Sequence, residues 1–122
     1  MKIIQMLAAA VLMTVLSACS SQQPMATVDK VDLPRFMGDW YVIANIPTFL
    51  EKDAFNPVES YALNEDGTIA TTFTFNDGAF DGEEKVYHPQ GFIRNSDTNA
   101  EWGMQFLWPI KADYRIVYLD ED

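Results

Sequence analysis

Gly38-Asp39-Trp40-Tyr41 is the most informative stretch of this chain. It follows Leu33-Pro34-Arg35-Phe36-Met37 and opens the apolar run Val42-Ile43-Ala44-Asn45-Ile46. Gly38 and Trp40 are two residues apart, so in a strand they share one face. We expect the glycine to allow a close backbone approach that a Cβ would block, and the tryptophan to plug one end of a small β-structure. An ordinary amphipathic strand with a buried tryptophan explains the tetrapeptide equally well.

Short strands separated by turns fill the chain after this stretch, and no long helical stripe is found. Asp66-Gly67 is the strongest hairpin signal, and Pro89 and Gly91 interrupt one strand. This spacing indicates an antiparallel meander that closes into a barrel or packs as a sandwich. We predict a helical turn at 31–37, strands at 38–46, 58–63, 68–75, 83–94, 101–107 and 113–119, and a loop at 47–56. We predict turns at 64–67, 76–82, 95–99 and 109–112.

Alternation in these strands predicts which side chains face inward. The inner set combines large aromatic residues with small or hydroxylated ones such as Ala44 and Thr71. A fully packed core rarely leaves hydroxyls without partners, whereas a lumen for an apolar ligand with a polar end would use them. The predicted inner faces include Trp40, Val42 and Ala44; Glu59, Tyr61 and Leu63; Ile69, Thr71, Phe73 and Phe75; Trp102, Met104 and Phe106; and Tyr114, Ile116 and Tyr118.

The N-terminus has the pattern of an export signal. Lys2 is followed by an apolar stretch from Ile3 to Leu16, near the length of a signal-peptide core and short for a membrane span. Leu16-Ser17-Ala18-Cys19 resembles the bacterial lipobox, whose cysteine is lipidated; a simple secretory cleavage site is the alternative. We predict a signal peptide at 1–18, a lipidated polar tether at 19–31 and a β-domain at 32–122.

Lipidation of Cys19, with palmitate among its acyl chains, would anchor the protein stably without a transmembrane helix. Ser20, rather than an aspartate, follows the cysteine. The resemblance to lipoprotein sorting signals therefore favours the periplasmic side of the outer membrane.

Composition argues against several function classes. The formal net charge of −10 and the lack of a basic patch argue against nucleic-acid binding. Cys19 is the only cysteine, which excludes an intramolecular disulfide and a Cys-based metal site. His88 is the only histidine, and it has no obvious partner for a catalytic triad. The acidic clusters lack calcium-loop spacing, so we expect no enzyme activity, no metal and no cofactor.

The ordered blocks resemble the lipocalin family, and within it the outer-membrane lipocalins of bacteria. The resemblance runs from Leu33 to Asp122. Phe36 to Tyr41 matches the family's Gly-x-Trp signature, Tyr61-Ala62-Leu63 matches the end of its second strand, and Val117 to Asp120 matches the start of its second signature. The family resemblance implies an eight-stranded barrel, of which this sequence contains about six strands. It also implies further strands, an arginine that packs on Trp40 and a C-terminal helix after Asp122, so we expect a C-terminally truncated member.

The resemblance implies a small hydrophobic ligand, such as a fatty acid or a lysophospholipid, inside the barrel. Gly38 and Trp40 would then be a structural motif, and the loop at 47–56 would be a lid. The residues predicted to bind the ligand are Val42, Ala44, Tyr61, Ile69, Thr71, Phe73, Phe75, Trp102, Met104, Phe106, Tyr114, Ile116 and Tyr118.

Two hypotheses of different classes follow. The first is a membrane-anchored lipocalin that stores or transports lipid in the cell envelope. The second is a lipid-anchored interaction module without a ligand pocket, whose free sheet edges pair with a partner strand or form a homodimer. Co-purified lipid would favour the first hypothesis, and edge-mediated assembly would favour the second.

Overall fold

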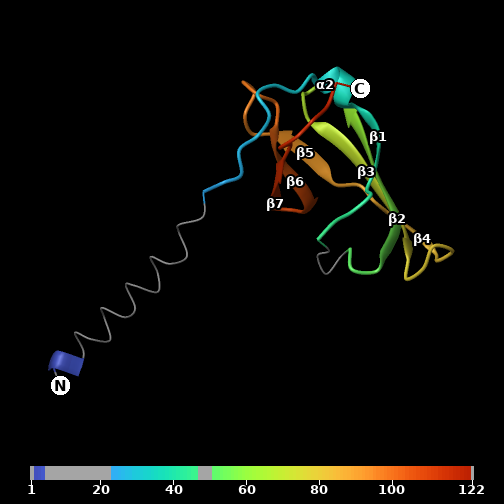
Figure 1. The fold of residues 1–122 in the computed structure, drawn as a ribbon, viewed down its shortest axis with the longest axis horizontal. Coiled ribbons are helices and arrows are strands. Elements are labelled where there is room, and N and C mark those ends of the chain that lie inside the picture. The colour runs from blue at the N-terminus through green and yellow to red at the C-terminus, as the bar shows by residue number, and fades with distance from the viewer. Residues whose placement is uncertain (1, 5–22, 47–50, 122) are drawn as a thin grey trace.

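Figure 1 shows the computed structural model of the chain, in which residues 2–4, 23–46 and 51–121 are described. The seven strands form one antiparallel sheet in the order β1-β2-β3-β5-β6-β7, and β4 also pairs with β3. The predicted antiparallel meander is therefore confirmed, and the sheet is unclosed in the described residues. The elements are α2 (Leu33–Phe36), β1 (Gly38–Tyr41), β2 (Ala54–Leu63), β3 (Ile69–Asp77), β4 (Glu84–Tyr87), β5 (Gln90–Ile93), β6 (Glu101–Leu107) and β7 (Ile110–Arg115).

The predicted helical turn before Gly38 is present as α2. The Asp32 side chain caps it by accepting a hydrogen bond of 3.3 Å from the Arg35 amide, and Pro34 lies in its first turn, where its missing N–H is tolerated. Gly38 then enters β1 with φ of 110°, in a region that residues with a Cβ rarely adopt. A Cβ on Gly38 would meet nothing within 4 Å. The predicted close backbone approach is therefore wrong, and the backbone conformation is the reason for glycine.

The predicted hairpin at 64–67 joins β2 to β3. The Asn64 amide donates to the Thr68 carbonyl at 2.8 Å, and the Gly67 amide donates to the Asn64 carbonyl at 3.0 Å. Asp66 closes the turn by accepting from the Thr68 amide at 2.9 Å. Gly67 has φ of 83°, which explains the Asp-Gly pair.

Several predicted boundaries are wrong. β1 ends at Tyr41 rather than at residue 46, and β2 begins at Ala54, inside the predicted loop, with a register shift between Phe55 and Val58. β7 begins at Ile110, inside the predicted turn at 109–112, and it ends at Arg115 rather than at residue 119. The interrupted strand predicted at 83–94 is two strands. β4 pairs with the C-terminal half of β3, and β5 pairs with its start.

The core lies at the end of the sheet that carries α2. Its buried members are Val31, Phe36, Tyr61, Ile69, Ala100, Trp102, Met104 and Ile116. The segment before α2 crosses the same end: the Val28 amide donates to the Ile116 carbonyl at 2.9 Å, and the Val31 amide donates to the Thr98 carbonyl at 2.8 Å. The C-terminal part of the predicted tether at 19–31 is thus joined to the domain, while Cys19 lies outside the described residues. No helix among the described residues is long and apolar enough to cross a membrane.

Candidate functional site

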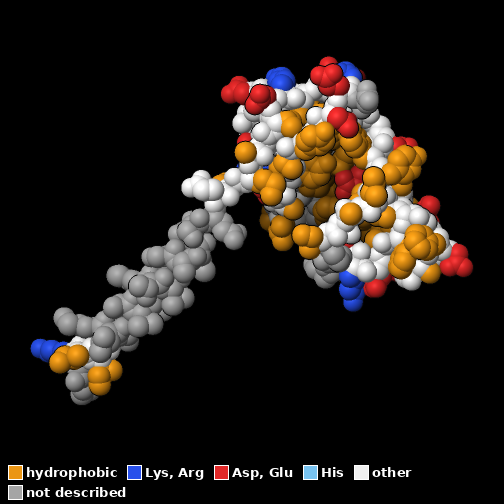
Figure 2. Space-filling model, viewed as in Figure 1, with side chains coloured by type: hydrophobic (Ala, Val, Ile, Leu, Met, Phe, Trp, Pro, Cys, Tyr) orange, Lys and Arg blue, Asp and Glu red, His pale blue; other side chains and the backbone are white. Residues whose placement is uncertain are grey.

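A cavity of about 740 Å³ lies on the concave side of the sheet. Figure 2 shows a deep hollow in this side of the molecule, surrounded by hydrophobic side chains. The size falls within the range of small-molecule sites, which are mostly apolar with a few polar groups. The residues around the cavity are Glu51, Glu59, Thr71, Phe73, Tyr87, Pro89, Met104, Phe106, Leu107, Ile110, Ala112, Asp113 and Tyr114.

Strand alternation explains most of this lining. In β3 the side chains of Ile69, Thr71, Phe73 and Phe75 are all buried, while those between them are less buried, which confirms the predicted inner face. Ile110, Ala112 and Tyr114 are spaced two residues apart on β7 and line the cavity, as does Asp113 between them. The wall is therefore built from the apolar faces of strands that are distant in the sequence.

An aromatic cluster forms the floor. Trp102 is completely buried, and its indole N–H donates to the Asn99 carbonyl at 2.8 Å. Its ring stacks on Tyr114 with centroids 5.0 Å apart, and it meets Phe36 and Tyr61 edge-on at 5.5 Å each. Such pairs contribute beyond their buried area. They fix the orientation of the Tyr114 ring, which faces the cavity.

A chain of polar groups lies where the floor meets the wall. The Tyr61 hydroxyl donates to the Glu59 carboxylate, and it lies 3.1 Å from the Tyr114 hydroxyl. Burial is the main cause that raises the pKa of Tyr61 well above its usual range, with Tyr114 and Glu59 adding to it. Burial also raises the pKa of Tyr114. Both hydroxyls therefore keep their protons at neutral pH.

The predicted ligand-binding residues divide into three groups by their place in the structure. Thr71, Phe73, Met104, Phe106 and Tyr114 line the cavity. A second group, Tyr61, Ile69, Trp102 and Ile116, belongs to the core cluster behind the floor. The third group, Val42, Ala44, Phe75 and Tyr118, lies outside the lining.

Each member of the third group has a structural reason for its place. Val42 and Ala44 follow the end of β1, so strand alternation no longer orients them. Phe75 packs against Phe73 and Tyr87, with ring centroids 5.4 Å and 6.0 Å away. Tyr118 is 77% exposed because β7 ends at Arg115, and its predicted inward orientation is wrong.

Trp40, the other half of the predicted structural motif, is not fully buried. It is 38% exposed, stacks on Phe36 with centroids 4.5 Å apart, and donates its indole N–H to the Phe36 carbonyl at 2.8 Å. It thereby joins α2 to β1. Phe36, rather than Trp40, is the aromatic residue of this motif that reaches Trp102.

Sequence reasoning missed part of the lining. Ile110 and Ala112 alternate with Tyr114, but the turn predicted at 109–112 concealed that signal. Glu59 shares the predicted inner face with Tyr61 and lines the cavity, although it is not among the predicted ligand-binding residues. Tyr87 is the last residue of β4, and Pro89 lies between β4 and β5; the break between these two strands hides both from an alternation read along 83–94.

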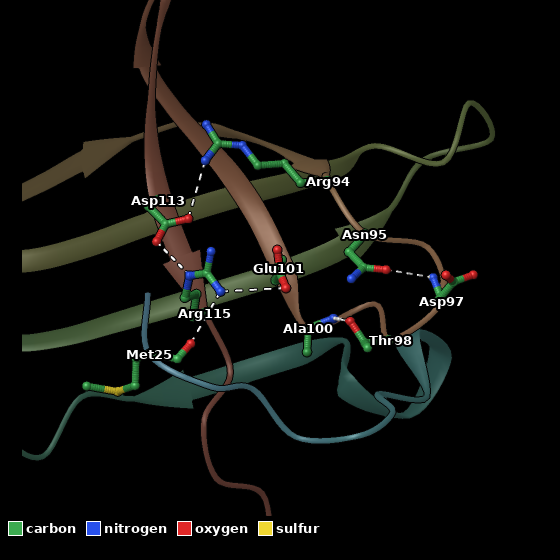
Figure 3. A network of polar contacts seen from close by, with 9 residues as sticks. All are labelled: Met25, Arg94, Asn95, Asp97, Thr98, Ala100, Glu101, Asp113 and Arg115. Carbon is green, nitrogen blue, oxygen red and sulfur yellow. Dashed lines mark hydrogen bonds and ion pairs between the residues drawn. The ribbon is translucent and has the colours of Figure 1, made fainter. Parts of the chain in front are cut away.

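Asp113 reaches the cavity rim, yet its carboxylate is held by arginines, as Figure 3 shows. Arg94 lies 3.3 Å from one oxygen, and Arg115 donates to the other at 2.8 Å. Arg115 also pairs with Glu101 at 3.5 Å and donates to the Met25 carbonyl at 3.2 Å. Asp113 raises the pKa of the Arg115 guanidinium. This network joins β6, β7 and Arg94, the residue after β5, to the N-terminal segment.

A smaller and more open depression of about 340 Å³ lies near the β2–β3 hairpin. His88 is part of it, and its Nδ1 lies 3.5 Å from the Thr72 hydroxyl. In the described part of the chain, no group of three or more His, Cys, Asp or Glu side chains is placed to hold a metal ion. The larger, apolar cavity is therefore the candidate site.

Comparison with known proteins agrees with this architecture. The model of the lipocalin-like domain family matches residues 31–122. The outer membrane lipoprotein Blc of Escherichia coli K12 is 25% identical over 127 residues, which cover 100% of this chain and 70% of that protein. The Citrobacter freundii lipoprotein of the same name is 26% identical, with the same coverage. Temperature-induced lipocalin-1 of Arabidopsis thaliana is 28% identical over 118 residues, covering 84% of this chain and 59% of that protein. The family match spans the whole sheet and its core, and the chain belongs to the lipocalin-like family.

Proposed function

We propose that this protein binds a small hydrophobic ligand with a single hydrocarbon chain, and that it stores or carries this ligand in the cell envelope. The cavity on the concave side of the sheet is the observation that carries the proposal. Its wall offers Phe73, Met104, Phe106 and Ile110 to a hydrocarbon, and its inner end offers polar groups to a head group. The relatives support the proposal because they include lipocalins by name.

Binding, rather than catalysis, is the activity that we propose. His88 lies in the shallow depression, and its described polar neighbour is the Thr72 hydroxyl rather than a group in the cavity. The cavity lining contains one hydroxyl of the serine or threonine type, that of Thr71, which donates to the Met104 sulfur at 3.7 Å. That geometry gives Thr71 no base to activate it as a nucleophile.

We also propose attachment to the outer membrane through a lipidated Cys19. The lipobox-like sequence and the name of the Blc relatives, outer membrane lipoprotein, support this location. Cys19→Ser should abolish incorporation of labelled palmitate and move the protein out of the membrane fraction. Palmitate labelling that persists in this variant would refute the anchor.

The mouth of the cavity suits exchange with a lipid surface. Leu107, Trp108 and Ile110, at the β6–β7 connection, are 71%, 81% and 67% exposed. Leu107 and Ile110 also line the cavity. Exposed apolar groups and tryptophan favour the membrane interface, so a ligand would enter from a lipid surface along Leu107 and Ile110.

Native mass spectrometry of the full chain, extracted from membranes in a mild detergent, tests ligand binding. We expect one co-purified lipid per chain. Ala112→Phe should reduce its occupancy because Ala112 lines the cavity. Ala62→Phe is the matched control, since Ala62 is exposed on the opposite face of β2. Equal lipid occupancy in the two variants, or none in the unmodified chain, would refute the cavity as the binding site.

The alternative function is an interaction module that works through its sheet edges. In the described residues β1 pairs with β2 alone and β7 with β6 alone, so each leaves one edge unpaired. Edge pairing with a partner strand or a second copy uses main-chain hydrogen bonds. A concentration-dependent dimer in size-exclusion chromatography, together with an empty cavity in native mass spectrometry, would favour this alternative.

A further inference from the structure

The hydroxyl protons at the inner end of the cavity, those of Tyr61, Tyr114 and Thr71, are already used in hydrogen bonds within the protein. A carboxylate only accepts hydrogen bonds, so the contact between Tyr61 and Glu59 uses the Tyr61 proton. The 3.1 Å contact between the two tyrosines must then use the proton of Tyr114. Thr71 donates its own proton to the Met104 sulfur. The donor direction runs from Tyr114 to Tyr61 to Glu59.

What remains for a ligand is a set of acceptors. Glu59 and Tyr114 line the cavity, and their unused lone pairs lie on a carboxylate oxygen and a phenol oxygen. The Thr71 oxygen adds a third acceptor. The raised pKa values of Tyr61 and Tyr114 keep this arrangement fixed at neutral and mildly alkaline pH. A ligand head group therefore satisfies this end of the cavity only by donating hydrogen bonds.

The charge around the cavity also favours a head group that donates hydrogen bonds. Glu51, Glu59 and Asp113 lie among the described lining residues, and none of those residues is a lysine, arginine or histidine. Arg94 and Arg115 compensate Asp113, and Lys111 lies 3.8 Å from the centre of the Phe92 ring. No such ion pair joins Glu59 to a cation among the described residues; its partner is the neutral Tyr61. The inner end of the cavity is therefore negative.

We propose that the cavity selects single-chain amphiphiles whose head group is cationic and donates hydrogen bonds, a primary ammonium above all, and discriminates against carboxylates of the same chain length. This selectivity rests on the proposed ligand-binding function and narrows its ligand class. An ammonium group supplies donors to Glu59, Tyr114 and Thr71 and is attracted by the negative charge. A fatty-acid carboxylate supplies no donor and is repelled by Glu59.

Calorimetric titration of the full chain, kept soluble in a non-ionic amphipol, tests the selectivity. The ligands are dodecylamine, 1-dodecanol and dodecanoate at about pH 8, where the amine is charged and the acid is ionised. Titration into amphipol alone gives the background from partitioning. We expect dodecylamine to bind at least about tenfold more tightly than dodecanoate, with the neutral alcohol between them.

Glu59→Gln should bring the ratio of the two affinities close to one, because it removes the charge and preserves the size of the side chain. Glu65→Gln is the matched control: it removes the same charge from an exposed residue of the β2–β3 hairpin, and it should leave the ratio unchanged. Circular dichroism checks that both variants fold. Tyr114→Phe is a second test because it removes an acceptor and retains the ring on Trp102; it should weaken amine binding severalfold and leave dodecanoate unaffected.

The outcomes separate the two proposals. If none of the three ligands binds above background, the ligand-binding function itself fails. If dodecanoate binds as tightly as dodecylamine, or more tightly, the cavity stands as a binding site and the head-group selectivity is refuted. A preference for the amine that Glu65→Gln reduces as much as Glu59→Gln would also refute it, since the net charge of the chain would then be the cause.

Discussion

Replacing Trp102 with phenylalanine tests whether the floor of the cavity is a tightly packed core. The change removes the pyrrole part of a fully buried indole and its 2.8 Å hydrogen bond to the Asn99 carbonyl. The hydrogen bond contributes about 1 kcal/mol, and the lost buried ring atoms contribute about 2 kcal/mol. We therefore expect the free energy of unfolding to fall by about 3 kcal/mol. For a domain of this size, that corresponds to a decrease in Tm of roughly 12–24 °C.

The chain provides two matched controls, since it contains three tryptophans. Trp108 is 81% exposed, so Trp108→Phe should change the free energy of unfolding by less than about 0.5 kcal/mol. Trp40 is 38% exposed and donates one hydrogen bond, so Trp40→Phe should cost about 1–2 kcal/mol. Urea unfolding of the full chain in amphipol, followed by far-UV circular dichroism, measures all three variants.

The order of the three losses is the decisive result. If Trp102→Phe costs no more than Trp108→Phe, Trp102 is not enclosed as described, and the floor below Tyr114 is not rigid. If Trp40→Phe proves the most destabilising, the contact between α2 and β1 carries more of the stability than the core around Trp102. Either result would refute the account of the cavity floor.

Three further predictions concern the scaffold around the site. Arg115→Met should release the N-terminal segment, because Arg115 holds the Met25 carbonyl as well as Asp113; limited proteolysis should then cut near Met25 sooner, and high salt should produce part of the same effect in the unmodified chain. Gly67→Ala should destabilise the domain by about 1 kcal/mol in urea unfolding through its φ of 83°, since its Cβ would meet nothing within 4 Å. Hydrogen bonds from Thr68 lower the pKa of Asp66 below its ordinary value of 3.8. The resulting stabilisation is present above that ordinary, unfolded-state pKa and is lost as the pH falls through the lower folded-state pKa. Asp66→Asn should therefore be destabilising at neutral pH and have little effect at strongly acidic pH in urea unfolding.

The sequence predicts the strand pattern well where a strong turn signal fixes the register. Asp66-Gly67 fixes the pairing of β2 with β3, and the inner face of β3 follows from that pairing. The strand at 101–107 matches β6 from end to end. In these places the local conformation and the burial of one face agree, so the pattern alone is sufficient.

The site is less predictable because it depends on where strands end. Pro109 suggested a turn that continued to residue 112, whereas β7 begins at Ile110, immediately after it. Because of this difference the sequence does not predict Ile110 and Ala112 as lining residues. It also predicts an inward orientation for Tyr118, which is exposed. The separation of floor from lining depends on three-dimensional packing: Trp102 and Met104 share a face of β6, yet Met104 reaches the cavity and Trp102 is covered. Strand alternation predicts which face of the sheet a side chain lies on, but not whether it reaches the cavity or is buried behind the lining.

The junction of the N-terminal segment with the domain sets the reach of the proposed anchor. The domain holds the chain from Met25 onward, through Arg115 and through the Val28 amide. If a lipid is attached at Cys19, the residues up to Met25 extend over at most about 20 Å. A globule of this size has a radius of gyration of about 12 Å, so this length is shorter than its diameter. The protein would then move as a body restrained to one membrane surface. It would exchange ligand with the membrane that carries it, and transfer to a second membrane would require another carrier.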